Sequence, residues 1–430
     1  MNYFIIAAMI LMLIFNSRVS KAYLTPTKVF VYVWGIQVIL CMVIFGNTVK
    51  WRYYGLFWML ILFFICGLIS IITITKNSPI YNGIENIDSK KKEYEININF
   101  SNKILVLLIV LGLFYAVLLI QRNGFSISNL LNLNALLEMN NTIAVQRYSG
   151  NFSAGVLSKI LLIFVYAAPM CGGYALVFAK KKKEKFLALA TMLPELLVLF
   201  TENTKAPFAG CIIFFISSWL VGNIVRYGEI RKFNVKTIII SISVLVGSFV
   251  LFTTTMMLRI GSWNLTTFGI VQNKMGNYVF GHIPAFDNWF SNNLWNYDYT
   301  FGAKTFIGIY DLLGLSSRTQ GIYQDNFIGG ALATNVYSYF RGIVDDFGMF
   351  GGLIFIVLML AAMTFAYRQL TSGRISIVNQ VLLTIGYSSI MFFMVSIFSY
   401  NSFLFGFVLF GFYLYLIKKK KRFKWKHESD

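Results

Sequence analysis

Residues 104–121 read ILVLLIVLGLFYAVLLIQ, an apolar run of 18 residues without a charged side chain. A helix of this length measures about 27 Å and nearly spans the roughly 30 Å hydrocarbon core of a bilayer. The run therefore predicts a transmembrane helix.

The rest of the chain has the same character. Its 430 residues are 57% hydrophobic and 13% charged, whereas a soluble globular domain is about 45–50% apolar and about 25% charged. This composition excludes a soluble enzyme, a secreted disulfide scaffold and a disordered chain. We predict an all-α fold, a polytopic membrane helix bundle that forms one integral membrane domain over residues 1–430.

About eleven spans are expected. Their limits are 2–15, 29–46, 55–75, 104–121, 155–179, 186–201, 206–222, 237–257, 347–367, 378–397 and 402–417. The runs at 2–15 and 186–201 are short, which leaves ten or twelve spans as alternatives. No basic segment precedes the first run and no small-residue cleavage site follows it, so we expect a retained helix rather than a signal peptide.

The net charge of +20 predicts orientation rather than nucleic-acid binding, because the basic clusters, such as 180–183 and 418–421, lie in short loops between apolar runs. One alternating set of loops holds 26 of the 37 lysines and arginines, and the other set holds 11. The richer set should be cytoplasmic. We therefore expect the N-terminus outside, the C-terminus inside and a basic cytoplasmic tail over 418–430.

The four cysteines lie within apolar runs and form no CxxC pair, so we expect packing residues rather than a disulfide framework or a zinc site. They are Cys41, Cys66, Cys171 and Cys211.

Two outside segments are too long to be simple connectors. The first, 122–153, contains SNLLNLNALLEM at 128–139, whose leucine spacing predicts a helix lying in the membrane interface. The second, 258–346, is crowded with aromatic and charged residues. Aromatic faces suit sugar rings, and the glycan-binding candidates are Tyr278, Trp289, Trp295, Asn335 and Tyr337. The alternative is an aromatic belt at the depth of the lipid headgroups.

Two stretches of the second segment carry a family resemblance: YVFGHIPAFD at 278–287 and NVYSYFRGIVDDFGMFGG at 335–352. The chain resembles the oligosaccharide repeat unit polymerases (Wzy-type O-antigen and capsule polymerases). LTPTK at 24–28, before a span with Trp34, and FTENTKAP at 200–207 resemble the family too. In the latter, Lys205 stands where the family usually has arginine.

The resemblance implies polymerisation of undecaprenyl-pyrophosphate-linked oligosaccharide units into O-antigen, the polysaccharide of lipopolysaccharide, or into capsule. The reaction would take place at the outer face of the bacterial cytoplasmic membrane and release undecaprenyl pyrophosphate. Implied partners besides the bilayer are a chain-length regulator and a flippase. No nucleotide motif is present, and we expect no cofactor. No outside DxD pair is present either, so we predict a metal-independent glycosyltransferase without a metal site.

Cationic side chains should stabilise the departing pyrophosphate, and arginine can do so with two parallel hydrogen bonds. The candidates are Arg147, Lys205, Arg259, Arg318 and Arg341. We expect the largest role for Arg341, because it lies inside the family stretch beside a span; its alternative is an interfacial anchor. Lys205 could instead pair with Glu202.

The catalytic candidates are His282, Asp287 and Arg341. A base would activate the acceptor hydroxyl, and of the outside groups only His282 has an ordinary pKa near neutrality. His282 could equally shape the loop. Asp345 and Asp346 at the start of a span could cap a helix, so the sequence does not identify the base.

Three other functions stay open. An O-antigen ligase shares the lipid substrate and the large outside loop, although the motif stretches favour a polymerase. A lipid-linked oligosaccharide flippase should carry charges within its spans and short loops, unlike this chain. A membrane acyltransferase would depend on His282 alone, since the second histidine, His427, lies in the basic tail.

Overall fold

The computed structural model describes the chain except residues 20, 21, 23, 76–93, 149–154, 203, 231–233, 317–325, 330, 331, 335, 394 and 420–430. The described part is helical apart from one antiparallel pair of short strands, β1 (Asn326–Gly329) and β2 (Leu332–Thr334). The helices are α1 (Asn2–Val19), α2 (Pro26–Phe45), α3 (Tyr54–Thr75), α4 (Ile98–Arg122), η1 (Ile127–Leu131), α5 (Leu133–Tyr148), α6 (Val156–Phe178), α7 (Lys182–Ala190), α8 (Leu193–Glu202), α9 (Lys205–Tyr227), α10 (Val235–Ile260), α11 (Leu265–Phe280), α12 (His282–Asn292), α13 (Ile307–Leu312), α14 (Tyr339–Thr371), α15 (Ile377–Met391), η2 (Ile397–Ser399) and α16 (Asn401–Ile417).

Eight of the described helices are long and apolar enough to cross a membrane: α1, α2, α3, α4, α6, α9, α10 and α14. α15 and α16 are apolar but shorter. Every predicted run except 186–201 coincides with one of these helices. The expected multi-pass helical membrane protein is confirmed, while the number of spans stays a prediction.

The expected helix over 186–201 is two helices, α7 and α8, separated by Thr191 and Met192. Pro194 lies in the first turn of α8, where its missing N–H costs nothing. In the interior of one continuous helix it would remove a backbone hydrogen bond and its ring would meet the preceding turn. The break packs closely against α6. Gly172 of α6 lies so near to it that an added Cβ would be 2.0 Å from Thr191 Oγ1.

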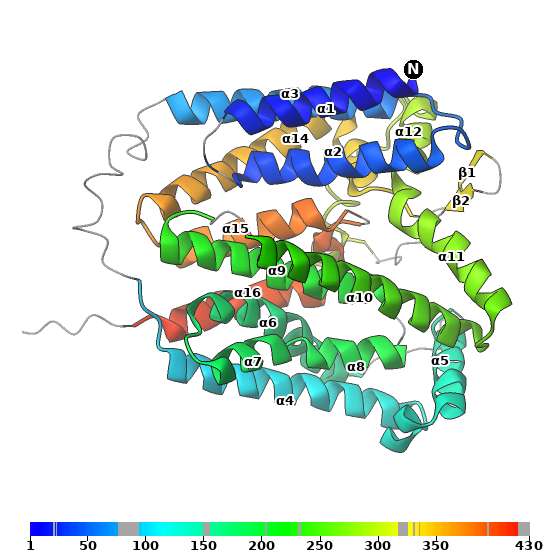
Figure 1. Ribbon diagram of the computed structural model, residues 1–430, viewed down its shortest axis with the longest axis vertical. Helices are drawn as coiled ribbons and strands as arrows, with labels where there is room; N and C mark the ends of the chain where they lie inside the picture. Colours follow the sequence, from blue (N-terminus) through cyan, green and yellow to red (C-terminus); the bar gives the residue numbers. More distant parts are fainter. Residues whose placement is uncertain are drawn as a thin grey trace, which may run out of the picture.

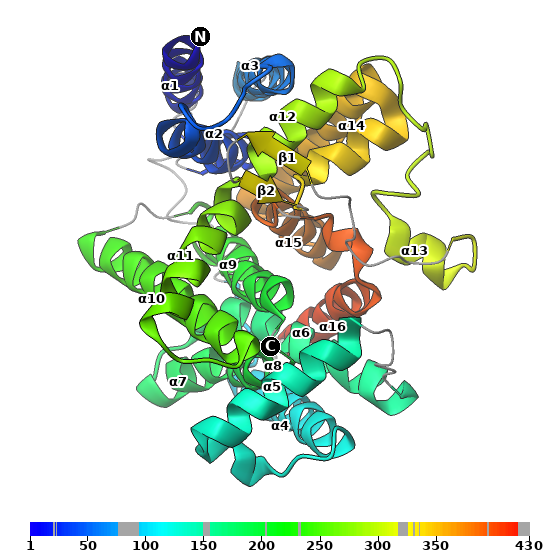
Figure 2. The same cartoon turned by 90° about the vertical axis from the view of Figure 1, so that its right-hand side faces the viewer.

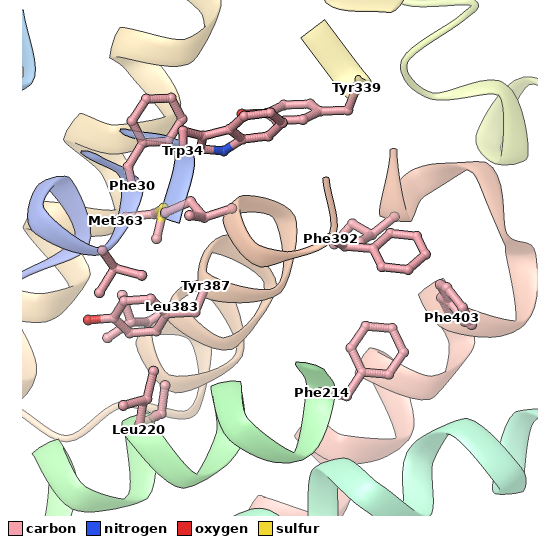
Figure 3. Close-up of a cluster of buried hydrophobic side chains, with 14 of the residues drawn as sticks. Phe30, Trp34, Phe214, Leu220, Tyr339, Met363, Leu383, Tyr387, Phe392 and Phe403 are labelled. Atoms are coloured by element: carbon pink, nitrogen blue, oxygen red, sulfur yellow. The ribbon is translucent and has the colours of Figure 1, made fainter. Parts of the chain in front are cut away.

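The long helices run side by side, and α15 lies in the middle of them (Figure 1). It contacts α2 and α14 on one side and α9 and α16 on the other. Side chains from all five helices meet in a buried, largely aromatic cluster (Figure 3). All four cysteines are buried among such residues. The core therefore joins the N-terminal helices to the rest of the bundle through α15.

The loops of the two predicted sets gather at opposite ends of the bundle. α5, α11, α12 and the strand pair lie at one end, which faces the viewer in Figure 2. At the other end the start of α4 meets the end of α16, where Asn97 N donates to Ile417 O at 2.9 Å. The assignment of these ends to the outside and the cytoplasm stays a prediction, and we call them the α12 end and the α7 end.

The helix predicted at 128–139 is divided at Asn132 into η1 and α5. α5 lies across the bundle rather than along it (Figure 1) and packs on α8 and α10.

A bend divides α14 at Gly348, whose φ of 73° and ψ of 175° are not helical. A Cβ at this position would lie 2.9 Å from Tyr299 Cε1, so glycine is needed for both the conformation and the contact. The predicted span 347–367 begins at this bend. Residues 339–347 therefore form a separate helical segment at the α12 end.

Candidate functional site

The two stretches that carry the family resemblance pack together with Trp34. The Trp34 ring lies 5.9 Å from His282 of α12 and 4.3 Å from Phe340 of α14, measured between ring centroids. Phe286 of α12 lies 5.8 Å from Phe340 in the same way. Segments far apart in the sequence thus form one aromatic layer beneath the α12 end.

Asp287 joins α12 to the start of α3. Its Oδ2 accepts hydrogen bonds from the backbone N–H groups of Arg52 (2.8 Å) and Tyr53 (2.9 Å), and its Oδ1 accepts one from Gly55 (3.0 Å). Burial raises the pKa of Asp287, although these N–H groups oppose the shift. Both carboxylate oxygens are engaged with the N-terminus of a helix, an arrangement that stabilises the fold.

His282 is fully buried. Its ring stacks on Phe393 with 4.6 Å between the centroids, and neither ring nitrogen makes a well-formed hydrogen bond. Burial lowers the pKa of His282 to about 3, an effect that the backbone carbonyl of Val279 only partly offsets. The imidazole is therefore neutral across the physiological pH range.

Arg341 lies between two aromatic rings. Its Cζ is 4.0 Å from the centroid of the Tyr337 ring and 5.2 Å from that of Trp289. A further ring, that of Tyr297, lies 6.2 Å from Trp289. Contacts of this kind hold a guanidinium group in place by cation–π attraction.

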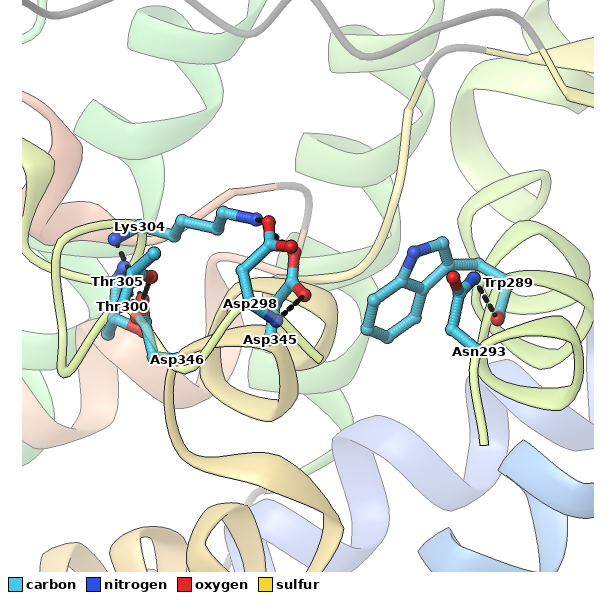
Figure 4. Close-up of polar contacts among 8 residues, drawn as sticks. All are labelled: Trp289, Asn293, Asp298, Thr300, Lys304, Thr305, Asp345 and Asp346. Carbon is cyan, nitrogen blue, oxygen red and sulfur yellow. Dashed lines mark hydrogen bonds and ion pairs between the residues drawn. The ribbon is translucent and has the colours of Figure 1, made fainter. Parts of the chain in front are cut away.

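Lys304 links Asp298 and Asp345 beside this arginine: its Nζ forms ion pairs with both carboxylates (Figure 4). Burial alone would lower the pKa of Lys304, but the hydrogen bonds to the two aspartates raise it overall. Lys304 in turn lowers the pKa of Asp298, and Arg341 adds to this shift. The Asp298 side chain is 66% exposed, whereas that of Asp345 is 9% exposed.

Asp346 holds the loop that carries Lys304. Its Oδ1 accepts from Lys304 N (2.9 Å) and from the Thr300 hydroxyl, and its Oδ2 accepts from Thr305 N (2.7 Å). The backbone of the loop is also bound, since Tyr299 N donates to Asp345 O at 2.9 Å. The paired aspartates after Arg341 thus fix the loop against α14.

We call the residues of this arrangement the Arg341 cluster: Trp289, Tyr297, Asp298, Lys304, Tyr337, Arg341 and Asp345. Figure 4 shows the Trp289 indole on one side and the Lys304 network on the other. The three rings of the cluster are buried, and two of them hold the guanidinium. The guanidinium and the exposed Asp298 carboxylate together can bind a ligand that carries both phosphate and hydroxyl groups.

Lys205 and Arg259 do not join this cluster. Lys205 begins α9 and Arg259 lies in the last turn of α10, and their positive charges interact. Asn141 of α5 donates to Arg259 O at 3.3 Å, and Asn140 donates to Phe200 O at 2.7 Å. This second cationic group lies beside α5, away from α12 (Figures 1 and 2).

The other predicted residues have different positions. Tyr278 is 36% exposed, and Trp295 is 68% exposed with its ring 5.9 Å from that of Phe350. Arg318 and Asn335 lie outside the described residues, and Arg147 lies in α5 with its side chain outside the described part.

Lys304 was not identified from the sequence. Asp298 and Tyr297 were noted only as part of the crowded segment 258–346 and were not singled out as site residues. One signal could have pointed to Lys304: the segment 258–346 contains only two lysines, and Lys304 is one of them. Its aspartate partner, however, lies 41 residues further along the chain, and only the folded structure shows that they meet.

Comparison of the chain with family models, with curated proteins and with solved structures gives no match in any of the three. Among the described residues, no group of three or more histidine, cysteine, aspartate or glutamate side chains could hold a metal ion.

Proposed function

We propose that the protein is a glycosyltransferase that polymerises lipid-pyrophosphate-linked oligosaccharide units into O-antigen or capsule, and that the Arg341 cluster binds its substrates. The observation that supports this most directly is the Arg341 guanidinium, which lies between Tyr337 and Trp289 beside an exposed carboxylate. The end of the bundle that holds it is the one that the charge pattern predicts to be outside.

The chemistry divides among these groups. The acceptor hydroxyl oxygen forms a bond to the anomeric carbon of the donor, and the bond from that carbon to the pyrophosphate oxygen breaks. Arg341 stabilises the negative charge that develops on the departing pyrophosphate. Trp289 and Tyr337, which are both buried, hold that guanidinium in place through their ring faces.

We assign Asp298 to the sugar hydroxyls, and its carboxylate takes up the proton that the acceptor hydroxyl loses. Asp287 and Asp346 bind backbone N–H groups through both oxygens, and Asp345 is nearly buried against Lys304. Asp298 is the exposed carboxylate of the cluster. His282, stacked in the aromatic layer, and Asp287, bound to the start of α3, are assigned to hold α12 in position.

One observation favours a second candidate, the lipid-linked oligosaccharide flippase. The divided pair α7 and α8 carries Glu195, which is fully buried with both carboxylate oxygens lacking a hydrogen-bond partner. Broken helices with buried carboxyl groups are typical of transporters.

Gene deletion followed by size-resolved analysis of the surface glycan tests the proposal. A polymerase predicts collapse of the ladder to a single repeat unit on the final acceptor. Long chains that remain on the lipid carrier would instead indicate a ligase, and single units trapped on the cytoplasmic side a flippase. An unchanged ladder would contradict all three.

Complementation with Arg341→Ala then tests the site. We expect the long glycan to be lost while protein level and membrane topology are retained, and Arg341→Lys to restore it only in part, because lysine lacks the two-pronged contact. Arg52→Ala is the matched control: Arg52 is an exposed arginine of the same end, and this change should leave the ladder intact. Normal chain length in Arg341→Ala would refute the assigned role.

A further inference from the structure

A second polar site lies at the α7 end of the bundle. A cavity of about 500 Å³ opens between the end of α6, the start of α7 and the last turns of α9. Its polar and aromatic lining comes from Lys180, Lys185, Trp219, Asn223, Arg226 and Tyr227. We call it the Arg226 pocket.

The guanidinium of Arg226 is fixed in the wall of this pocket. Its Nη1 donates to the carbonyl of Val177 at the end of α6. The group also lies over two rings, 5.1 Å from the centroid of Tyr227 and 5.7 Å from that of Phe178. A cation held in this way needs little reorganisation to receive an anion.

The lining contains three cations and no carboxylate. The nearby acids lie outside the lining. Glu184 Oε2 accepts from the backbone N–H groups of Lys180 (2.7 Å) and Lys181 (2.9 Å), Glu95 pairs with Lys419, and both carboxylates interact electrostatically with Lys180. Glu229 follows Tyr227 by two residues. The side chains of Lys180 and Lys185 are exposed at the mouth. The pocket is therefore positively charged.

The remaining wall is apolar. It consists of Leu176 and Val177 of α6 and the indole of Trp219 of α9. Ends of membrane helices that combine basic side chains with an aromatic and aliphatic wall lie at the depth of the lipid headgroups.

We propose that the Arg226 pocket binds the phosphate of an anionic phospholipid, with Lys180, Lys185 and Arg226 on the phosphate, and with Leu176 and Trp219 against the glycerol and the first carbons of the acyl chains. Basic pockets between helices bind lipid headgroups in this way. The site lies at the end of the bundle opposite to the Arg341 cluster and does not depend on the glycan activity.

Native mass spectrometry of the full chain in a neutral detergent measures this binding. Phosphatidylglycerol and phosphatidylcholine with the same acyl chains are titrated separately. We expect tighter binding of phosphatidylglycerol. The variant Lys180→Ala/Lys185→Ala should lose about 25-fold in that affinity, about fivefold for each lysine, while binding of phosphatidylcholine is unchanged.

The matched control is Lys182→Ala/Lys183→Ala, which removes two charges from the same lysine run but not from the pocket lining. It should keep the affinity of the wild type, as should Lys180→Arg/Lys185→Arg. Equal losses in the two alanine pairs, or equal affinity for both lipids, would overturn the proposal. Displacement of the lipid by excess inorganic phosphate would also overturn it, in favour of a site for free phosphate.

Discussion

The Arg341 cluster and the Arg226 pocket use the same arrangement at opposite ends of the bundle. In each, an arginine lies over two aromatic rings: Tyr337 and Trp289 in the first, Tyr227 and Phe178 in the second. They differ in their acids, because Lys304 pairs with Asp298 and Asp345, whereas no carboxylate lines the Arg226 pocket. The arginine and rings suit a phosphate in both places, and the acids add the capacity to bind hydroxyl groups.

A second parallel concerns how the lysines are presented. Asp346 accepts hydrogen bonds from the backbone of Lys304 and Thr305, and Glu184 accepts them from the backbone of Lys180 and Lys181. Asp346 is fully buried, whereas Glu184 is only half-buried. The loop held by Asp346 is therefore preorganised, which suits a reaction site. The loop held by Glu184 is more adaptable, which suits a lipid site.

The largest effect should follow from Asp346→Ala. The change leaves the N–H groups of Lys304 and Thr305 buried without their acceptor, which should cost about 3 kcal/mol of stability. The loop that carries Asp298 and Lys304 should shift, and displaced binding groups can lower a rate about 100-fold. Thermal unfolding in detergent and the glycan ladder measure the two consequences.

Glu184→Ala is the corresponding change at the α7 end. The N–H groups that donate to Glu184 are exposed to water, so the unfolding temperature should fall only slightly, in line with a loss of under about 1 kcal/mol. The ladder should stay normal. Equal losses of stability in Asp346→Ala and Glu184→Ala would contradict the prediction that the more deeply buried carboxylate contributes more to stability.

The sequence predicted the helices far better than the site. Uninterrupted apolar runs are strong local signals, so ten of the eleven expected spans coincide with one helix each. The exception, 186–201, is divided at Thr191 and Met192. There the apolar run continues through the break. Hydropathy alone does not show that Pro194 interrupts the helix, so the two helices were predicted as one.

The site depends on contacts that no local pattern contains. Arg341, Trp289 and Tyr337 were expected from the sequence and do lie together. Lys304 was missed because its partner Asp345 is reached only after the loop folds back onto α14. Lys205 and Arg259 were grouped with Arg341 as cations of the predicted outside segments, and Lys205 also for its place in a family stretch. In the fold they lie together beside α5 instead.

An intermediate effect is expected for Trp289→Ala. The change removes one of the two rings over Arg341, a contact worth about 1 kcal/mol. Long glycan should fall about fivefold, and Trp289→Phe should keep most of it. Trp263→Ala, at an exposed position of the same outer segment, is the control for loss of an indole.

Trp219→Ala makes the same change in the Arg226 pocket. It should weaken the binding of phosphatidylglycerol and leave chain length unaltered. A shortened ladder in this variant would show that the two regions do not act independently.

The smallest effect on the product should come from His282→Phe, and pH makes this variant informative. The pKa of Asp298 is lowered and that of Lys304 is raised. The stabilisation from Asp298 is therefore present above its ordinary pKa and lost only in acid, and that from Lys304 is present below its ordinary pKa and lost only in alkali. Neither group should titrate between about pH 5 and pH 8.

His282 is the only histidine among the described residues, and burial lowers its pKa to about 3. Because the folded pKa is below the ordinary value of about 6.5, the stabilisation is complete above that pH and is lost as the pH falls toward the folded value. The unfolding temperature of the wild type should therefore decrease from pH 7 to pH 5, and that of His282→Phe should decrease less. Glycan length at neutral pH should change less than about twofold, since phenylalanine preserves the stacking on Phe393. Loss of all long glycan in a stable His282→Phe protein would instead make His282 the base and place the chemistry in the aromatic layer rather than beside Asp298.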